Sequence, residues 1–157
     1  SSAVVDLLGI FLLVRGTFGP TIRPLLGLIL LFILRQLCQA LTALPIPTGP
    51  GQVIWGEPGF PSLLVTYSVS NDLFFSGHTA LAVFGAIELG RLGRKWWPVA
   101  VLVTVLEGGV VLVLWAHYTM DVYAGAVTAV AMALLADRLA PPCDRALARL
   151  RLKTGPV

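Results

Sequence analysis

Charged side chains are scarce in this sequence: only 12% of its 157 residues are Asp, Glu, Lys or Arg, whereas 57% are hydrophobic. Soluble domains carry roughly 25% charged residues, so the composition excludes an ordinary soluble domain. The mean hydropathy of +0.87 indicates a membrane protein. Cysteine is scarce as well: Cys38 falls in an apolar segment and Cys143 in a basic one. This placement argues against a disulfide framework.

Long apolar stretches predict membrane helices over residues 24–44, 76–90, 97–116 and 118–139. A further stretch, residues 3–14, is shorter than the roughly 20 residues that a span needs. Because the chain opens on Ser1 without an initiator Met, we expect residues 1–15 to be part of a helix whose start is missing. The fold class predicted is an all-α integral membrane protein, with no internal repeat and therefore a single domain.

Nearly all Lys and Arg residues fall on one side of the membrane if each predicted helix crosses it once. The connection over residues 43–75 contains no Lys or Arg. Short cationic loops stay in the cytoplasm, so residues 140–157 are predicted to be a basic cytoplasmic tail, and the 43–75 loop to lie on the outer face. The net charge of +3 then needs no nucleic-acid partner. Ten of the eleven cations fall on the cytoplasmic side: Arg15, Arg23, Arg91, Arg94, Lys95, Arg138, Arg145, Arg149, Arg151 and Lys153.

The two histidines of the chain lie at the outer ends of predicted helices. In a helix, residues i and i+4 share a face, so Asp121 is expected to hydrogen-bond the ring of His117. His117 is therefore the candidate nucleophile of a phosphoryl transfer through a phospho-histidine. His78 is the candidate acid for the leaving oxygen and base for the entering one. An interhelical hydrogen bond without catalysis is the alternative for a lone membrane histidine.

Arg35 is the cation that falls inside an apolar segment, in the outer half of the membrane. An intramembrane charge is costly, so it marks a functional candidate, and a guanidinium suits phosphate oxygens. The alternative is an arginine neutralised by Glu107 for packing alone. Gln39 stands four residues after Arg35 on the same helix face and is a candidate contact for the substrate headgroup.

Ser76 and Gly77 precede His78 at a predicted helix start. Free backbone N–H groups there favour an anion, so both residues are candidates for binding the substrate phosphate, with Ser76 as the N-cap. Asp72 is a candidate for the headgroup or for orienting His78, and an ordinary Asx turn is its alternative. No metal and no cofactor are expected. If Asp121 orients His117, one zinc ligand is used, and magnesium would need more carboxylates.

Two short motifs carry a family resemblance. Ser-Gly-His-Thr over residues 76–79 and His-Tyr-Thr-x-Asp over residues 117–121 resemble signature motifs of the sphingomyelin synthase family. That family lies within the type 2 phosphatidic acid phosphatase (PAP2) superfamily. Arg35 and the Thr-Ala-Leu-Pro-Ile-Pro stretch over residues 42–47 resemble another. The resemblance implies one PAP2-like transmembrane domain over residues 1–157, with five to six membrane helices and an active site on the exoplasmic face.

The resemblance also implies an activity. The enzyme would move a phosphorylated headgroup from a glycerophospholipid to ceramide or diacylglycerol through phospho-His117. PAP2 phosphatases carry Ser-Arg where this chain has Val110-Val111, which favours a transferase. Two alternatives stay open. One is a lipid phosphate phosphatase or phospholipase C-like hydrolase that uses water as acceptor, and the other is a non-catalytic membrane lipid-binding protein.

Overall fold

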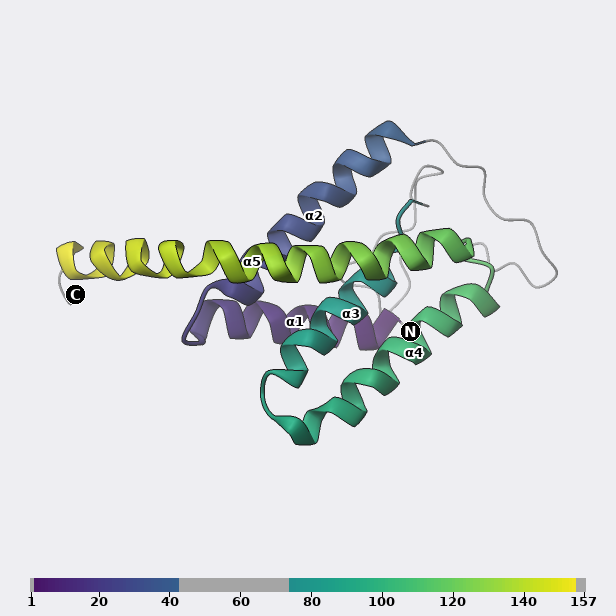
Figure 1. Ribbon diagram of the computed structural model, residues 1–157, viewed down its shortest axis with the longest axis horizontal. Coiled ribbons are helices and arrows are strands. Elements are labelled where there is room, and N and C mark those ends of the chain that lie inside the picture. The colour runs from purple at the N-terminus through teal and green to yellow at the C-terminus, as the bar shows by residue number, and fades with distance from the viewer. Residues whose placement is uncertain (1, 43–73, 155–157) are drawn as a thin grey trace.

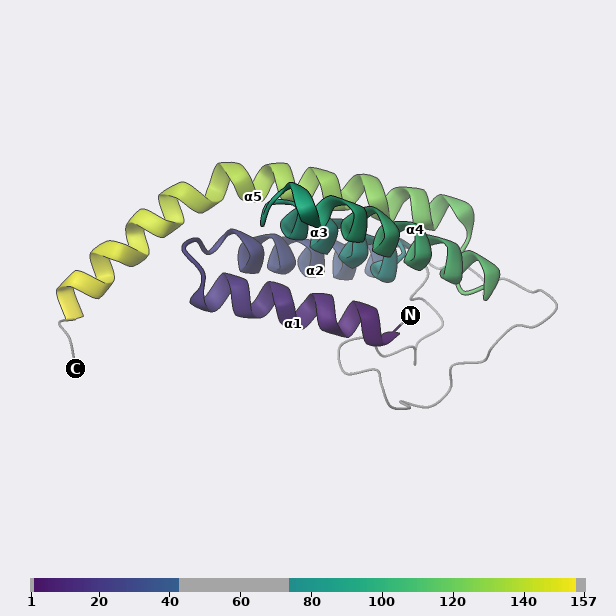
Figure 2. The ribbon, with the colours of Figure 1, turned by 90° about the horizontal axis from the view of Figure 1, so that it is seen from below.

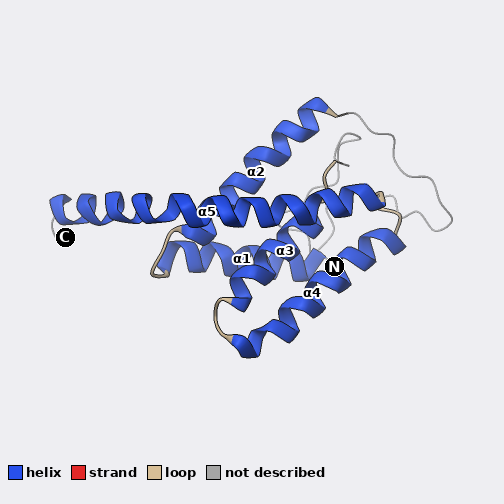
Figure 3. Cartoon of the chain, in the orientation of Figure 1, coloured by secondary structure: helices blue, strands red, loops and turns tan. Residues whose placement is uncertain are grey.

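The computed structural model describes residues 2–42 and 74–154, and these form helices joined by short turns, without a strand (Figure 3). The prediction of an all-α protein is confirmed for this part of the chain. The elements are α1 (Ser2–Phe18), α2 (Arg23–Leu41), α3 (Gly77–Gly90), the 3₁₀ helix η1 (Arg94–Trp96), α4 (Trp97–Val113) and α5 (Thr119–Thr154).

Within residues 2–42 and 74–154, three helical stretches are long and apolar enough to cross a membrane: residues 23–41, 94–113 and 119–150. Their outward faces carry large exposed apolar side chains, such as Ile33, Val105 and Leu134. Such faces are costly in water and suit contact with lipid. Helices α1 and α3, with 17 and 14 residues, are shorter than the roughly 20 residues of a full span.

Helix α3 lies at the centre of the bundle and is in contact with each of the other α-helices (Figures 1 and 2). In Figure 2, α5 lies on one side of it and α1 on the other. Its Ala and Gly residues allow this close packing. A Cβ atom on Gly85 would lie 3.0 Å from a methyl group of Leu8 in α1. Gly27 of α2 meets the ring of Phe84 in the same way. Small residues of α3 and its neighbours therefore let the helices approach around a core that includes Leu12, Leu31 and Phe84.

Helix α5 continues past residue 139, where we expected the last helix to end, and reaches Thr154. Residues 143–153 are rich in Ala, Leu and Arg, which favour a helix, and this outweighs Pro141 and Pro142 inside it. The carboxylate of Asp144 also accepts hydrogen bonds from Thr21 Oγ1 (2.7 Å) and Ile22 N (2.9 Å). The predicted tail over 140–157 is thus helical to Thr154, projects beyond the bundle and is curved (Figure 2).

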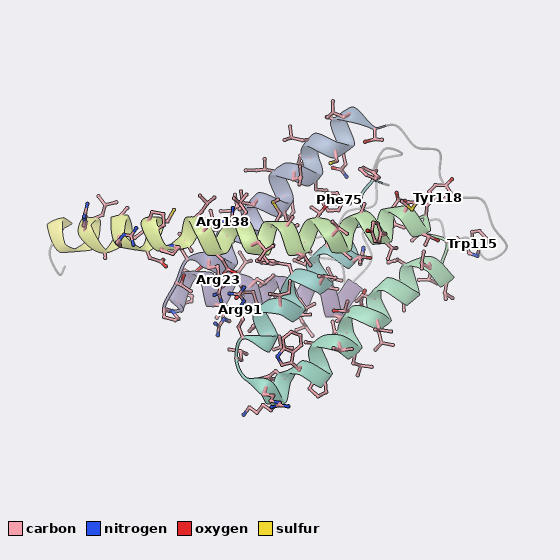
Figure 4. The ribbon with its side chains drawn as sticks, viewed as in Figure 1. Arg23, Phe75, Arg91, Trp115, Tyr118 and Arg138 are labelled. Carbon is pink, nitrogen blue, oxygen red and sulfur yellow. The ribbon has the colours of Figure 1, made fainter. Side chains whose placement is uncertain are left out.

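Four charged side chains join α2, α3 and α5 at one end of the bundle, and we call this the charged end: Arg23, Glu88, Arg91 and Asp137. Arg23 holds the buried Glu88 by two hydrogen bonds, of 3.1 and 2.9 Å. Arg91 holds Asp137 by two more, of 2.8 and 2.7 Å. Figure 4 shows Arg23, Arg91 and Arg138 near one another, and Phe75, Trp115 and Tyr118 toward the opposite end.

Candidate active site

The turn between α4 and α5 sets the position of His117, which lies two residues before α5 begins. The N–H groups of Ala116 and His117 both donate to the carbonyl of Val111, at 3.0 and 3.3 Å. Trp115 has a φ of 53°, a left-handed conformation that bulky residues rarely adopt, so the turn holds local strain. The result is a buried His117 side chain on a tightly defined backbone.

Asp121 lies beside His117, but not in the hydrogen bond that the sequence suggested. Nδ1 of His117 is 3.8 Å from Oδ2 of Asp121, beyond hydrogen-bond range. That oxygen accepts instead from the N–H of Tyr118, at 2.9 Å. The i,i+4 rule assumes that both residues belong to one helix, whereas α5 begins at Thr119. The buried carboxylate still faces the imidazole at ion-pair distance.

The start of α3 is fixed against the start of α5. Ser76 N donates to the carbonyl of Asp121 at 3.1 Å, and Ser76 Oγ accepts from Thr79 N at 3.4 Å. The predicted N-cap role of Ser76 is therefore confirmed. A Cβ on Gly125 would lie 2.6 Å from the Ser76 carbonyl oxygen, so only glycine permits this approach of α5. Gly77 and His78 then occupy the first turn of α3, where N–H groups lack helical acceptors.

Arg35 of α2 reaches the same first turn. A Cβ on Gly77 would lie 2.8 Å from both Cζ and Nε of Arg35, so the guanidinium rests against the Gly77 backbone. Glu107, the alternative partner of Arg35, is buried in α4, and α2 and α4 share no extended contact. Oε2 of Glu107 has no hydrogen-bond partner among the described residues. Arg35 thus lies beside the first turn of α3, which includes His78, and away from the middle of α4.

His78 is almost fully buried, and the charges of His117, Arg35 and Asp6 all act on it. The sequence analysis did not identify Asp6, which is buried in α1. A carboxylate inside an apolar stretch was the available signal, because such residues are costly in a membrane. Side chains from α1, α2, α3 and the α4–α5 turn therefore converge at this end of the bundle.

The structure gives less detail on the candidate headgroup contacts Gln39 and Asp72. Gln39 is half-buried on α2, one turn beyond Arg35. Asp72 lies outside the described residues. Among residues 2–42 and 74–154, no group of three or more His, Cys, Asp or Glu side chains is arranged to hold a metal ion.

We call Arg35, Ser76, His78, His117 and Asp121 the site end of the bundle. It combines two imidazoles with a carboxylate, a guanidinium and the N-terminus of a helix. Two imidazoles can transfer protons, and a guanidinium beside a helix N-terminus can bind an anion. The arrangement is suited to a reaction at a phosphate group.

A family model described as AtPDCT1/2 matches residues 4–138. This is the phosphatidylcholine:diacylglycerol cholinephosphotransferase family. The assignment to the sphingomyelin synthase family and the PAP2 superfamily is wrong, because the matching family is AtPDCT1/2. No curated protein and no solved structure shows a significant match.

Proposed function

The chain belongs to the AtPDCT1/2 family, and on that premise we propose that it transfers phosphocholine from phosphatidylcholine to diacylglycerol. A family of headgroup phosphotransferases supports this class of reaction. The observation that carries the proposal is the convergence of Arg35, His78 and the His117–Asp121 pair. Ceramide, the other acceptor that the sequence resemblance implied, is not part of the proposal.

In the first half-reaction, Nε2 of His117 attacks the phosphorus of phosphatidylcholine. The P–O bond to the glycerol oxygen breaks, His78 protonates that oxygen, and diacylglycerol leaves. Phosphocholine is then bound to His117 through a P–N bond. Nδ1 of His117 faces Asp121 at 3.8 Å, so the carboxylate stabilises the imidazolium that forms and leaves Nε2 for the attack.

In the second half-reaction, the hydroxyl of another diacylglycerol takes the place of the first. His78, now neutral, removes its proton, the oxygen attacks phosphorus, and the P–N bond breaks. Phosphatidylcholine with new acyl chains leaves and His117 is restored. Exclusion of water from this buried site would favour the lipid hydroxyl over hydrolysis.

Arg35, Ser76 and Gly77 bind the phosphate in this proposal. The guanidinium provides two parallel donors for phosphate oxygens, and the first turn of α3 adds backbone N–H groups. Both are fixed before the substrate arrives, because Arg35 packs on Gly77 and Ser76 is tied to Asp121. Such preorganised donors stabilise the charge that develops in a phosphoryl-transfer transition state. Gln39, one turn beyond Arg35 on α2, would contact the headgroup in this proposal.

We propose further that the site end faces the exoplasmic side of the membrane. The cations Arg23, Arg91 and Arg138 gather toward the opposite end (Figure 4), and the positive-inside rule assigns such an end to the cytoplasm. A membrane-impermeant reagent tests this orientation in sealed cells. It should label a cysteine introduced at the exposed Met120 and leave one introduced at Arg94 unlabelled.

Label transfer followed by mass spectrometry tests the reaction. Purified protein receives phosphatidylcholine with a deuterated choline group, together with diacylglycerol that carries distinguishable acyl chains. The expected product is deuterated phosphatidylcholine with the acyl chains of the acceptor, formed without added metal. Free deuterated phosphocholine, released at the same rate with and without diacylglycerol, would identify a hydrolase instead.

The covalent step has its own test. With donor alone and an alkaline quench, a phosphocholine adduct should appear on the peptide that contains His117. A matched Tyr118→Phe variant, which keeps the turn and both histidines, should retain the adduct. Full label transfer without any adduct in rapid-quench samples would replace the two-step route by direct transfer.

A further inference from the structure

An apolar cavity of about 240 Å³ opens beside the site end, between α1, α2 and α3. Its walls include Leu13 of α1, Leu28 and Phe32 of α2, and Leu81 of α3. Arg35 is the charged residue among the described residues that line it. The cavity is therefore apolar along its length, with a cation at one point.

The positions of the lining residues give the cavity a direction. Leu28 precedes Arg35 by about two turns of α2, roughly 10 Å along the helix axis. Gly77 also lines the cavity, and Arg35 packs against its backbone. One end of the cavity thus adjoins Gly77 at the start of α3, and the other lies among the leucines.

The cavity is also accessible from the side of the bundle. Leu13 and Phe32, on neighbouring helices, are 38% and 49% exposed, while Phe75 and Ala80 are buried behind them. A molecule that enters between α1 and α2 would come from the surrounding lipid.

We propose that this cavity binds an acyl chain of the donor phospholipid, in the portion next to the glycerol. The inference rests on the proposed function, because it takes the phosphate of the same lipid to lie on Arg35. Charge complementarity indicates the occupant. It must carry an anionic group that pairs with Arg35, joined to an apolar chain that lies along Leu28 and Leu81. At roughly 30 Å³ per methylene-sized group, the volume holds about eight of them.

Photo-crosslinking tests the location without requiring turnover. Full-length His117→Ala protein in phosphatidylcholine vesicles receives a phosphatidylcholine with a diazirine in the glycerol-proximal part of one chain. Peptides of α1 and α2 that contain Leu13 and Phe32 should carry the label in excess over the outer face of α4 around Val105. Equal labelling of both faces would overturn the inference.

Chain-length selectivity gives the second readout. Leu13→Trp would fill the mouth of the cavity, whereas Val14→Trp adds the same bulk at the next residue, which is 52% exposed and does not line the cavity. Leu13→Trp should lower kcat/KM for long-chain phosphatidylcholine about tenfold relative to a diacetyl analogue, whose chains are too short to fill the cavity, as expected for blocked apolar contacts. Val14→Trp should leave that ratio unchanged.

The outcomes separate this inference from the proposed function. Normal phosphocholine transfer with equal effects of Leu13→Trp and Val14→Trp would overturn the acyl-chain site alone. Labelling of Leu13 and Phe32 without any phosphocholine transfer would overturn the proposed function and retain a lipid-binding cavity.

Discussion

The two ends of the bundle use buried charge in different ways. At the charged end, Glu88 is held by Arg23 at 2.9 Å, and Asp137 is held by Arg91 at 2.7 Å. Each carboxylate there accepts two short hydrogen bonds from one arginine, and longer ion pairs, Arg23–Asp137 at 3.6 Å and Arg91–Glu88 at 3.8 Å, link the two pairs. The site end instead gathers two imidazoles, and Nδ1 of His117 lies 3.8 Å from Oδ2 of Asp121. The charged end is thus arranged to hold helices together, and the site end is arranged around groups that can change charge.

This difference has an energetic basis. A buried charge is costly unless a partner and good geometry offset the desolvation. Arg23 provides both for Glu88. At the site end, a phosphate bound between Arg35 and the imidazoles would interact with groups already removed from water, where electrostatic interactions are stronger. Substitutions at the two ends should therefore affect different properties: stability at the charged end and reaction rate at the site end.

The largest effect is expected at the nucleophile. His117→Ala should lower turnover by at least about 10⁴-fold, because no covalent intermediate can form. The midpoint of thermal unfolding should change little compared with the effect of a charged-end substitution. Label transfer and a thermal unfolding assay on the same sample measure both. Near-normal turnover would end the phospho-histidine scheme.

The charged end should show the reverse pattern. Glu88→Ala leaves Arg23 partly buried without its carboxylate and should lower the free energy of unfolding by about 3–5 kcal/mol. The folded fraction should keep its turnover number. The double variant Arg23→Ala with Glu88→Ala should cost less than the sum of the single changes. Additive costs would show that the two side chains do not stabilise each other.

Asp121→Asn and Asp137→Asn compare the site end and the charged end within one helix, α5. Asp121→Asn keeps the size of the side chain and its acceptor for Tyr118 N, but removes the charge that stabilises the His117 imidazolium. The rate should fall about 100-fold, as for loss of a group that orients a catalytic histidine. Asp137→Asn, on the same helix at the charged end, should leave the rate unchanged. Single-turnover kinetics would separate the two variants.

Gly125→Ala probes the contact between the start of α3 and the start of α5, which together form part of the site. The added Cβ would lie 2.6 Å from the Ser76 carbonyl oxygen, so the helices must shift apart. We expect a loss of about 1–3 kcal/mol of stability together with a roughly tenfold lower rate, since misplaced catalytic groups slow the reaction. Gly109→Ala is the control, because a Cβ there meets nothing within 4 Å.

The smallest effect is expected from Asp137→Ala. Its side chain and that of Arg91 are each about one-third exposed, and exposed ion pairs stabilise proteins by only about 0–1 kcal/mol. Urea unfolding at low and high salt would measure this. A loss as large as that of Glu88→Ala would mean that the four charges of this end act as one unit.

The sequence predicted the helices more closely than the contacts between them. The lengths of the apolar stretches alone predicted helices at 97–116 and 118–139. In the structure, α4 is Trp97–Val113 and α5 begins at Thr119. The helix cap at Ser76 followed from local chemistry. The 3.8 Å separation of His117 and Asp121 did not, because it depends on where α5 begins and on the strained turn at Trp115.

Contacts between distant residues lay beyond reach of sequence patterns. Glu88 accepts two hydrogen bonds from Arg23, 65 positions away, and nothing in local spacing selects that pair. Only its longer contact with Arg91, at 3.8 Å, has the i,i+3 spacing of helix neighbours. Asp6 was overlooked because its apolar segment was too short to read as a span. The packing of Arg35 on Gly77 depends on a side chain that glycine does not have. Residue types indicated phosphate chemistry, while the arrangement around it came from tertiary packing.

The distance along α5 between the site end and the charged end determines how the bundle fits the thickness of a lipid bilayer. From Asp121 to Asp137 the helix rises about 24 Å at 1.5 Å per residue, less than the roughly 30 Å hydrocarbon thickness of a typical bilayer. If Arg91 and Arg138 lie at one interface, as in the proposed orientation, the histidines would lie several ångströms below the other. A thicker bilayer would bury them further, and a thinner one would bring them to the headgroups. Catalytic rate should therefore depend on acyl-chain length of the host bilayer, even when the substrates stay the same.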